Sequence, residues 1–426
     1  MLFCAIFTRY ICKKLIFLIS IYQDILIILA MSYQTIEEYF TQFSDDVEEI
    51  NVKFVSDHLP DLSRFYKLKK LSCDRIKLLY LPSLPSTLQE LRCCDNKLTC
   101  LPVLPSSLEI LWCCVNKLTC LPLLPSTLTK LNCNNNQLTY LPSLPSTLKI
   151  LSCTDNQLVR LPPLPSNLIE LCCYYNKLTH LPLLPSTLKY LYCTKNQLTY
   201  LPLLPSTLKS LCCDDNQLTH LPLLPSTLEK LWCYSNQLTY LPLLPSTLIE
   251  LNCDNNQLTY LPLLSSSLKE LHCNNNQLTH LPLLPSTLKI LSCTDNQLVC
   301  LPLLPSNLKT IYCYKNQLTC LPLLPDTLEI LYFNYNNLIP DYYIKPDVSL
   351  SMVDYIKKLQ KQIKILNQFR ELFYALKYKK KFLDLLWVNI REPKIRNKYK
   401  PENLMAMLEE KEDITLDELD ELLEKW

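Results

Sequence analysis

The feature that most constrains this chain is a 20-residue unit that repeats thirteen times from Leu81 to Pro340 without an insertion or deletion. The unit reads L-P-x-L-P-S-T-L-x-x-L-x-C-x-x-N-x-L-T-x, and Leu201 to His220 is a representative copy. A unit of this length cannot fold alone, because ordering its residues costs more free energy than its own small core contributes. The units must therefore stack on one another into a solenoid with a continuous core.

Within each unit, positions 8 to 18 give the pattern L-x-x-L-x-C-x-x-N-x-L. The alternation around position 11 predicts a short strand whose Leu and Cys point into the core while the intervening residues point outward. The Asn at position 16 can donate to and accept from buried main-chain groups of adjacent turns. The L-P-x-L-P half predicts an extended, polyproline-like return path, because Pro fixes φ and removes N–H donors.

A degenerate copy from Leu68 to Leu78 fits the same frame with Ile76 at the Asn position, which gives fourteen expected turns. The pattern is the signature of the leucine-rich repeat, with Cys in place of one core Leu. This resemblance implies an α/β repeat solenoid, a horseshoe of about fourteen turns. The expected horseshoe has a parallel concave sheet, a polyproline-like convex side and helical caps at both ends.

The complete unit also resembles the repeat domain of secreted bacterial effectors, some of which carry a C-terminal ubiquitin-ligase domain with a cysteine nucleophile. The last cysteine here is Cys320, inside the repeats, so the tail cannot supply that nucleophile. The cysteine-rich unit and lysine-rich tail, in a chain poor in Gly, Ala and Arg, resemble more closely the leucine-rich-repeat proteins of giant DNA viruses of the mimivirus type. The viral resemblance implies a host protein as partner.

The repeat boundaries divide the chain into four segments. These are an apolar N-terminal segment (1–30), an N-terminal cap (31–67), the leucine-rich repeats (68–340) and a helical, charged C-terminal tail (341–426). The first segment is an upstream extension if translation starts at Met31; the alternative is a signal peptide or membrane anchor that begins at Met1. Ile36, Tyr39 and Phe40 indicate one apolar helix face in the cap.

The tail has helical periodicity from Leu350 to Ile390 and an uneven charge. Residues 341–401 carry 15 Lys or Arg against 6 Asp or Glu, whereas residues 402–426 carry 2 against 10. The basic part can be interpreted as a site for nucleic acid or an acidic membrane. The preferred interpretation is that the two parts pack on each other as a polar cap. Membrane contact is expected only through residues 1–30 or the basic tail.

Thirteen cysteines, from Cys73 to Cys313 at intervals of 20, share the inward position 13. We expect them to be buried free thiols that replace Leu, because stacked Cβ atoms run parallel rather than converge. The alternative pairings join equivalent positions of adjacent turns: Cys94 with Cys114, Cys100 with Cys120, and Cys300 with Cys320. Free thiols predict a reducing cytoplasm, that of the host if the protein is viral; secretion or membrane anchoring is the alternative.

The sequence has no recognisable active site. The chain contains no glycine, where average usage predicts roughly 30, so it lacks every glycine-dependent nucleotide or nucleophile motif. Its turns must rely on Asn and Pro instead. The histidines at position 20, His180, His220 and His280, are at least two turns apart, too far to share one zinc ion. We therefore expect a non-enzymatic protein with no cofactor and no metal.

The outward positions 10, 12, 14 and 15 vary between units and are rich in aromatic residues. These candidate partner-binding residues are Trp112, Tyr174, Tyr175, Tyr190, Tyr192, Trp232, Tyr234, Tyr312, Tyr314, Tyr332 and Tyr335. Tyr and Trp dominate interface hot spots, so the sequence predicts a protein-binding concave face. Positions 12, 14 and 15 carry seven Asp against four Lys or Arg, so no nucleic acid is expected there. The alternatives are a scaffold without a dedicated ligand, or an adaptor that recruits ubiquitin machinery.

Overall fold

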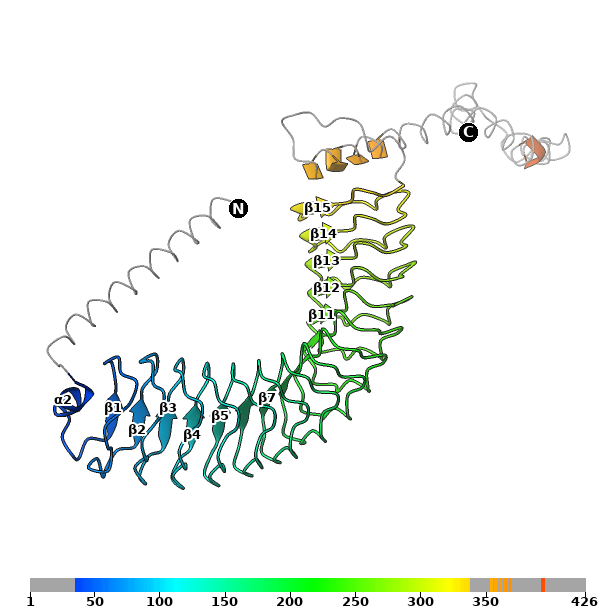
Figure 1. The fold of residues 1–426 in the computed structure, drawn as a ribbon. Helices are drawn as coiled ribbons and strands as arrows, with labels where there is room; N and C mark the ends of the chain where they lie inside the picture. The colour runs from blue at the N-terminus through cyan, green and yellow to red at the C-terminus, as the bar shows by residue number, and fades with distance from the viewer. Residues whose placement is uncertain are drawn as a thin grey trace, which may run out of the picture. The chain divides into compact units, whose positions relative to one another are not determined.

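The computed structural model describes residues 35–337 continuously and short stretches between 353 and 394. The chain divides into two compact units, Met1–Lys345 and Pro346–Trp426, and the first carries the repeats (Figure 1). Within it, a 15-stranded sheet follows chain order from β1 to β15. The strands are β1 (Glu49–Asn51), β2 (Lys70–Ser72), β3 (Glu90–Arg92), β4 (Ile110–Trp112), β5 (Lys130–Asn132), β6 (Ile150–Ser152), β7 (Glu170–Cys172), β8 (Tyr190–Tyr192), β9 (Ser210–Cys212), β10 (Lys230–Trp232), β11 (Glu250–Asn252), β12 (Glu270–His272), β13 (Ile290–Ser292), β14 (Thr310–Tyr312) and β15 (Ile330–Tyr332).

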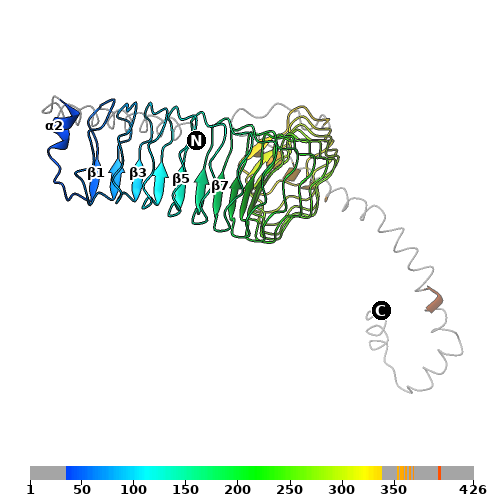
Figure 2. The same cartoon turned by 60° about the horizontal axis from the view of Figure 1, so that its bottom comes forward.

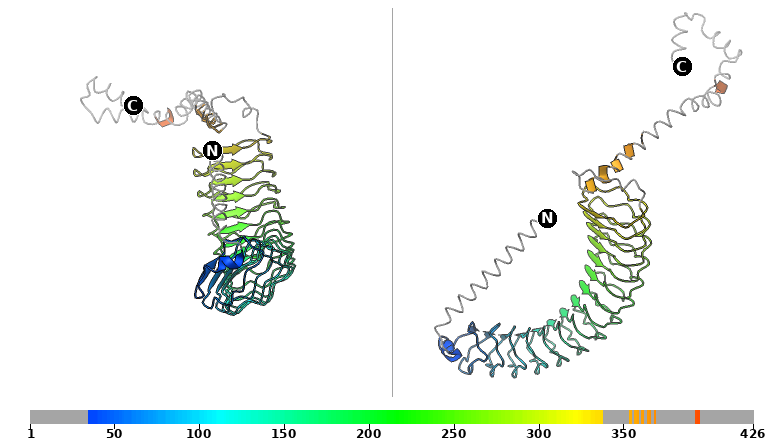
Figure 3. Two further views of the ribbon diagram at one scale, coloured as in Figure 1. Left: turned by 60° about the vertical axis from the view of Figure 1, so that its left-hand side comes forward. Right: turned by 45° about the horizontal axis from the view of Figure 1, so that its top comes forward.

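All neighbouring strands pair in parallel, and from β2 onward each residue faces its equivalent one repeat later. In β9 and β10, for example, Leu211 pairs with Leu231 and Cys212 with Trp232. The strands lie side by side in Figure 2 and line the inner side of the arc in Figures 1 and 3. The predicted solenoid with a parallel concave sheet is confirmed.

Each repeat contributes a fixed set of side chains to the core. In the unit that contains β9, Leu208, Leu211, Cys213 and Leu218 are completely buried and Leu201 is nearly so. Burial of one such side chain contributes about 1.5–3 kcal/mol. The cysteines of position 13 are all buried from Cys73 to Cys313, and Phe333 takes their place in the last turn, as the sequence predicts.

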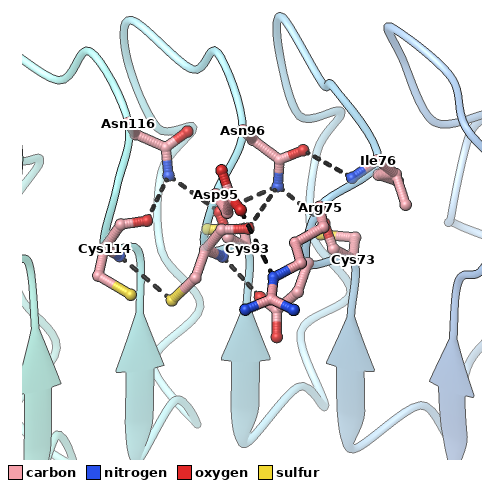
Figure 4. A network of polar contacts seen from close by, with 10 residues as sticks. Cys73, Arg75, Ile76, Cys93, Asp95, Asn96, Cys114 and Asn116 are labelled. Carbon is pink, nitrogen blue, oxygen red and sulfur yellow. Dashed lines mark hydrogen bonds and ion pairs between the residues drawn. The ribbon is translucent and has the colours of Figure 1, made fainter. Parts of the chain in front are cut away.

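The Asn at position 16 recurs every 20 residues, which places one side-chain amide between every two neighbouring turns. In Figure 4, Asn96 Nδ2 donates to the carbonyl oxygens of Cys73 and Cys93, at 2.8 and 3.1 Å. Its Oδ1 accepts from the backbone N–H of Ile76 at 3.2 Å. The predicted role of this Asn, bonding to main-chain groups of adjacent turns, is confirmed.

The turn that follows each strand has a left-handed residue at position 15, immediately before this Asn. The φ angles of this residue lie between 49° and 58° in every turn from Asp95 to Tyr335. Glycine adopts this conformation without steric cost, and Asn and Asp tolerate it. The chain uses Asn or Asp in many turns but also Val115, Tyr175 and Lys195. Reliance on Asn and Pro therefore describes only part of how the turns form without glycine.

The return half of the unit contains no regular helix and is held by a side chain that the sequence analysis overlooked. Thr207 at position 7 donates its hydroxyl to the carbonyl oxygens of Ser186 and Leu188 in the preceding turn, at 2.7 and 2.8 Å. Equivalent bonds recur along the array, for example from Thr227. Because the prolines lack N–H groups, these hydroxyls supply the donors that link successive turns on this side.

The N-terminal cap contains the expected helix, α2 (Ile36–Phe40), with Ile36, Tyr39 and Phe40 buried. It also contains β1, which the sequence analysis did not predict and which extends the sheet by one strand. Ile50 is the buried centre of that strand, between two exposed residues, which is the same alternation as in the repeats. The predicted helical cap at the other end falls largely outside the described residues, as do residues 1–34.

Candidate protein-binding surface

The eleven predicted binding residues belong to the strands or to the two positions that follow the buried Cys or Phe of position 13. Six of them are strand residues that flank a buried Leu or Ile, so their side chains leave the sheet on its concave side. The most exposed are Tyr335, Tyr332, Tyr175, Tyr314, Tyr174 and Trp232, and the other five are partly exposed. Their location on a solvent-facing surface is confirmed, while their role in binding stays a prediction.

Six of these residues gather on β7 to β10 and the turns that follow them. We call Tyr174, Tyr175, Tyr190, Tyr192, Trp232 and Tyr234 the central cluster. The rings of Tyr174 and Tyr175 meet edge to face, with centroids 5.8 Å apart. Lys195 Nζ lies 4.4 Å from the centroid of the Tyr175 ring and 2.6 Å from its hydroxyl oxygen. The ammonium group thus bonds to the hydroxyl and also lies within range of the ring face.

The middle of the central cluster has a floor of small side chains. Strand β9 is buried on both faces, because Cys212 lies in register between Tyr192 of β8 and Trp232 of β10. The large side chains of Tyr192 and Trp232 cover the small side chain of Cys212. Burial raises the pKa of the Tyr192 phenol, and burial together with the nearby carboxylates of Asp214 and Asp215 raises that of Tyr234.

Asp214 follows β9 and is only 2% exposed. Its Oδ2 accepts a hydrogen bond from the Thr194 hydroxyl at 2.8 Å, whereas Oδ1 has no hydrogen-bond partner among the described residues. Burial raises the pKa of this carboxyl to about 7, against the opposing effect of the Thr194 bond. Burial also raises the pKa of Asp254, although the Asn274 side chain and backbone amide both bond to it. The centre of the concave face therefore contains one buried and one partly buried acid.

Two other basic side chains of the concave face, Lys230 and Arg92, are already paired. Lys230 Nζ lies 4.6 Å from the Trp232 ring centroid and 2.7 Å from Glu250 Oε2. Arg92 stacks over Trp112 at 4.3 Å and bonds to Glu90 at 2.6 Å. Each of the two tryptophans therefore has one basic side chain over its ring.

A separate pair of rings lies at the C-terminal end of the sheet. Tyr312 and Tyr332 are stacked, with centroids 5.4 Å apart and planes inclined by 13°. Tyr335 lies just beyond them and is 77% exposed. At the opposite end, β1 to β3 surround an open hollow of about 190 Å³ with mixed charge, lined by Glu49, Asn51, Lys70, Leu71, Ser72, Glu90 and Arg92.

The cysteine pairs proposed from the sequence have different surroundings. The Cys114 backbone N–H donates to Cys94 Sγ at 3.3 Å, so this pair is in close contact. The hydrogen bond between the two thiols raises the pKa of Cys94 and lowers that of Cys114. Cys100 and Cys300 are exposed. All described cysteines are present as free thiols.

The sequence analysis missed the most exposed apolar side chains. Position 3 of the unit, between the two prolines, carries a Leu or Val in most turns, and these residues are 64–87% exposed. The leucine row comprises Val103, Leu123, Leu183, Leu203, Leu223, Leu243, Leu263, Leu283, Leu303 and Leu323. The sequence feature that could have revealed this exposure is the L-P-L-L-P motif. Its first Leu after a Pro lies outside the strand, so it does not belong to the inward and outward alternation that identifies core residues. Apolar surface of this continuity is unusual for a soluble monomer.

The described residues contain neither a candidate metal site nor a helix that could span a membrane. Among them, no group of three or more His, Cys, Asp or Glu side chains could hold a metal ion. None of their helices is long and apolar enough to cross a membrane.

Solved structures with the same fold include proteins of the bacteria Yersinia, Leptospira and Listeria. The leucine-rich effector protein YopM from Yersinia pestis is 34% identical, with a TM-score of 0.60 over 67% of this chain and 88% of YopM. YopM from Yersinia enterocolitica WA-314 is 34% identical, with a TM-score of 0.57 over 66% of this chain and 72% of that one. The functional domain of InlJ from Listeria monocytogenes, which includes a cysteine ladder, is 27% identical, with a TM-score of 0.50 over 64% of each chain.

Neither a protein-family model nor a curated protein matches the sequence. The structural similarity nevertheless extends over most of both YopM chains at an identity above 30%. In this chain the matched region consists of the stacked strands and 20-residue units that the sequence predicts. The chain belongs to the leucine-rich-repeat proteins.

Proposed function

We propose that this protein is a non-enzymatic module that holds a protein partner on its concave sheet, chiefly through the central cluster. The observation that carries the proposal is the gathering of exposed and partly exposed Tyr and Trp rings on three of four adjacent turns. Large rings that remain in water forgo most of the stabilisation that burial gives them. A partner that covers these rings would recover it.

Tyr175 supports this interpretation through its backbone. Its φ of 54° costs roughly 1–2 kcal/mol for a residue other than Gly, Asn or Asp. Asn135, Asn255 and Asn275 occupy the same position in other turns and tolerate the conformation better. Tyr175 is 48% exposed, so packing within the chain offsets little of this cost. Unfavourable conformation together with incomplete burial favours a role in contacting another molecule.

The chemistry of the described side chains favours binding over catalysis. Burial raises the pKa of the core thiols, which disfavours the nucleophilic thiolate. The buried acid Asp214 bonds to a threonine rather than to a candidate nucleophile with its own base. The lysines of the central cluster bond to Tyr175 and Glu250, which leaves no run of free cations for nucleic acid.

The test replaces Tyr174, Tyr175, Tyr190 and Tyr192 with Ser. A matched control replaces Tyr200, Tyr240 and Tyr260, which are exposed at position 20, also with Ser. Both variants should keep the circular-dichroism spectrum and melting temperature of the parent, because none of the rings belongs to the core. Proteins captured by the parent in a quantitative pull-down should be lost with the first variant and retained with the control. Equal capture by both variants would refute the concave-face proposal.

The leucine row favours a second candidate, a scaffold that assembles through its exposed Leu side chains. Light scattering of a variant with Leu223, Leu243 and Leu263 changed to Ser tests it. Ser stands at position 3 in other turns, as Ser83 and Ser143, so the fold should tolerate the change. If the protein is such a scaffold, the variant should have a lower particle mass than the parent. An equal particle mass for the two proteins would exclude the scaffold role.

We also propose a cytoplasmic location and a viral origin, with a host protein as partner. The location is supported by the free, buried thiols of the core. Thiol titration of denatured, unreduced protein should find 23 free thiols per chain, and a markedly lower count would contradict a reducing compartment. The origin is supported by the absence of glycine and the abundance of Lys, Asn and Tyr.

A further inference from the structure

We propose that the central cluster and its adjoining carboxylates bind a lysine- or arginine-rich segment of the partner. The inference deepens the proposed function and rests on it, because it names the chemistry that the concave face recognises. It stands on three features of the described residues: cations already bound to the rings, carboxylates without a cationic partner, and a low floor between the rings.

The first feature is that the aromatic rings of this surface already hold ammonium groups. Lys195 lies over Tyr175 and Lys230 over Trp232, with Nζ 4.4 and 4.6 Å from the ring centroids. An aromatic face attracts a cation because of its quadrupole. The cluster has further rings, those of Tyr174, Tyr190, Tyr192 and Tyr234, with no such cation among the described residues. These rings can accept the cationic side chains of a partner.

The second feature is an excess of negative charge among the rings. Within residues 35–337, no ion pair includes Glu170, Asp215 or Asp254. The two lysines of the cluster are held by Tyr175 and Glu250 and do not neutralise these acids by direct contact. A basic segment would supply the missing positive charge. An anionic ligand would find the same surface repulsive.

The third feature is the shape of the sheet at β9. The short side chain of Ser210 lies in register between Tyr190 and Lys230, and that of Cys212 between Tyr192 and Trp232. Asp214 stands at the end of this floor, and its Oδ1 has no hydrogen-bond partner among the described residues. An extended segment laid over the floor would bring its cationic side chains between rings on two sides, with the free Oδ1 of the Asp214 carboxyl group at the end of the floor.

The experiment uses the full chain and a short lysine homopeptide that carries a photoreactive benzophenone group. Crosslinked residues are identified by mass spectrometry, with a glutamate homopeptide of equal length as the probe of opposite charge. Crosslinks of the lysine probe should map to residues 170–254. The acidic segment 402–426 should also capture this probe, which gives an internal reference within the same molecule. The absence of crosslinks in 170–254, or equal labelling there by the glutamate probe, would overturn the proposal.

The charge is tested by the combined changes Glu170→Gln, Asp215→Asn and Asp254→Asn. The two asparagines are compatible with the repeat, because Asn255 and Asn274 stand at the equivalent positions of neighbouring turns. Loss of three partly exposed attractions should reduce crosslinking in 170–254 by about tenfold. The reference crosslinks in 402–426 should not change. The control Asp95→Asn, at position 15 near the N-terminal end, should leave both regions labelled as in the parent.

The charge-neutral variant also separates this inference from the proposed function. If the natural partner is lost with the tyrosine variant but retained with the charge-neutral one, the concave face binds protein but not through a basic segment. If both variants lose the partner, both proposals stand. If both retain it, the proposed function fails, and crosslinks of the lysine probe would then report only a general affinity of acids for lysine.

Discussion

Asn216 donates from Nδ2 to the carbonyl oxygen of Cys193, 3.1 Å away in the preceding turn. The same nitrogen lies 3.0 Å from the carbonyl oxygen of Cys213 and 2.9 Å from that of Asp214. Oδ1 accepts from the backbone N–H of Leu198 at 3.0 Å. One buried side chain thus bonds to main-chain groups of two turns, which makes position 16 the polar joint between neighbouring repeats.

The change Asn216→Asp tests this joint. A carboxylate keeps the acceptor for Leu198 but removes the donors and faces three carbonyl oxygens. We expect a loss of about 3 kcal/mol or more in the free energy of unfolding, from unpaired buried groups and a desolvated charge. Urea denaturation at neutral pH measures it. The control Asn255→Asp places the same change at exposed position 15, where Asp215 and Asp295 occur naturally, and should cost little. Similar losses in both variants would contradict the structural role.

The left-handed turn residue makes a second prediction. Val115 has a φ of 53°, which is unfavourable for a β-branched side chain. The change Val115→Asn should stabilise the protein by about 1 kcal/mol, because Asn tolerates this conformation. The reverse change in the next turn, Asn135→Val at a φ of 52°, should destabilise it by a similar amount. Chemical denaturation of the two variants and the parent supplies the comparison; no gain at Val115 would show that the position is unstrained.

Two leucines of one unit provide a third prediction about the leucine row. Leu228 is completely buried, whereas Leu223 is 82% exposed. The change Leu228→Ala should cost about 2–5 kcal/mol, through lost burial and the cavity that remains. The change Leu223→Ala should cost almost nothing in dilute solution. A large cost at Leu223 in a concentrated sample alone would indicate that the row is covered by another copy.

The solenoid and its register could be predicted from the sequence because one constraint repeats thirteen times. The buried Leu211 and Cys213 alternate with outward residues, and the Asn spacing fixes which backbone groups meet. Strand β1 was missed because the cap does not share the 20-residue frame: Ile50 pairs with Leu71 at a different spacing. The role of Thr207 was missed because its partners lie in the preceding turn, a contact that only the stacked structure defines.

The candidate surface was predictable only as a set of outward positions. Alternation identified Tyr192 and Trp232 as concave residues, but not that Cys212 lies between them or that the floor is buried. The desolvation of Asp214 depends on those neighbours, so a sequence pattern that assigns position 14 to solvent gives the wrong environment for this residue. The leucine row was missed because a Leu between prolines has no periodicity from which its exposure follows.

Asp214 allows a fourth prediction, on pH. Its pKa is about 7 in the folded chain, mainly because of burial, and near 3.9 when unfolded. Between these values the folded state holds a proton that the unfolded state has released, so this group makes stability fall as pH rises from about 4 to 7.

The change Asp214→Asn removes the effect and keeps an acceptor like Asn134 or Asn274, which bond to the next turn. Relative to the parent, the variant should gain about 4 kcal/mol at pH 8 compared with pH 4. Urea denaturation of both proteins at the two pH values isolates this group, because the titration of other residues cancels in the difference. A difference between the two proteins that does not depend on pH would mean that Asp214 is charged throughout, and that solvent reaches the floor of the concave face.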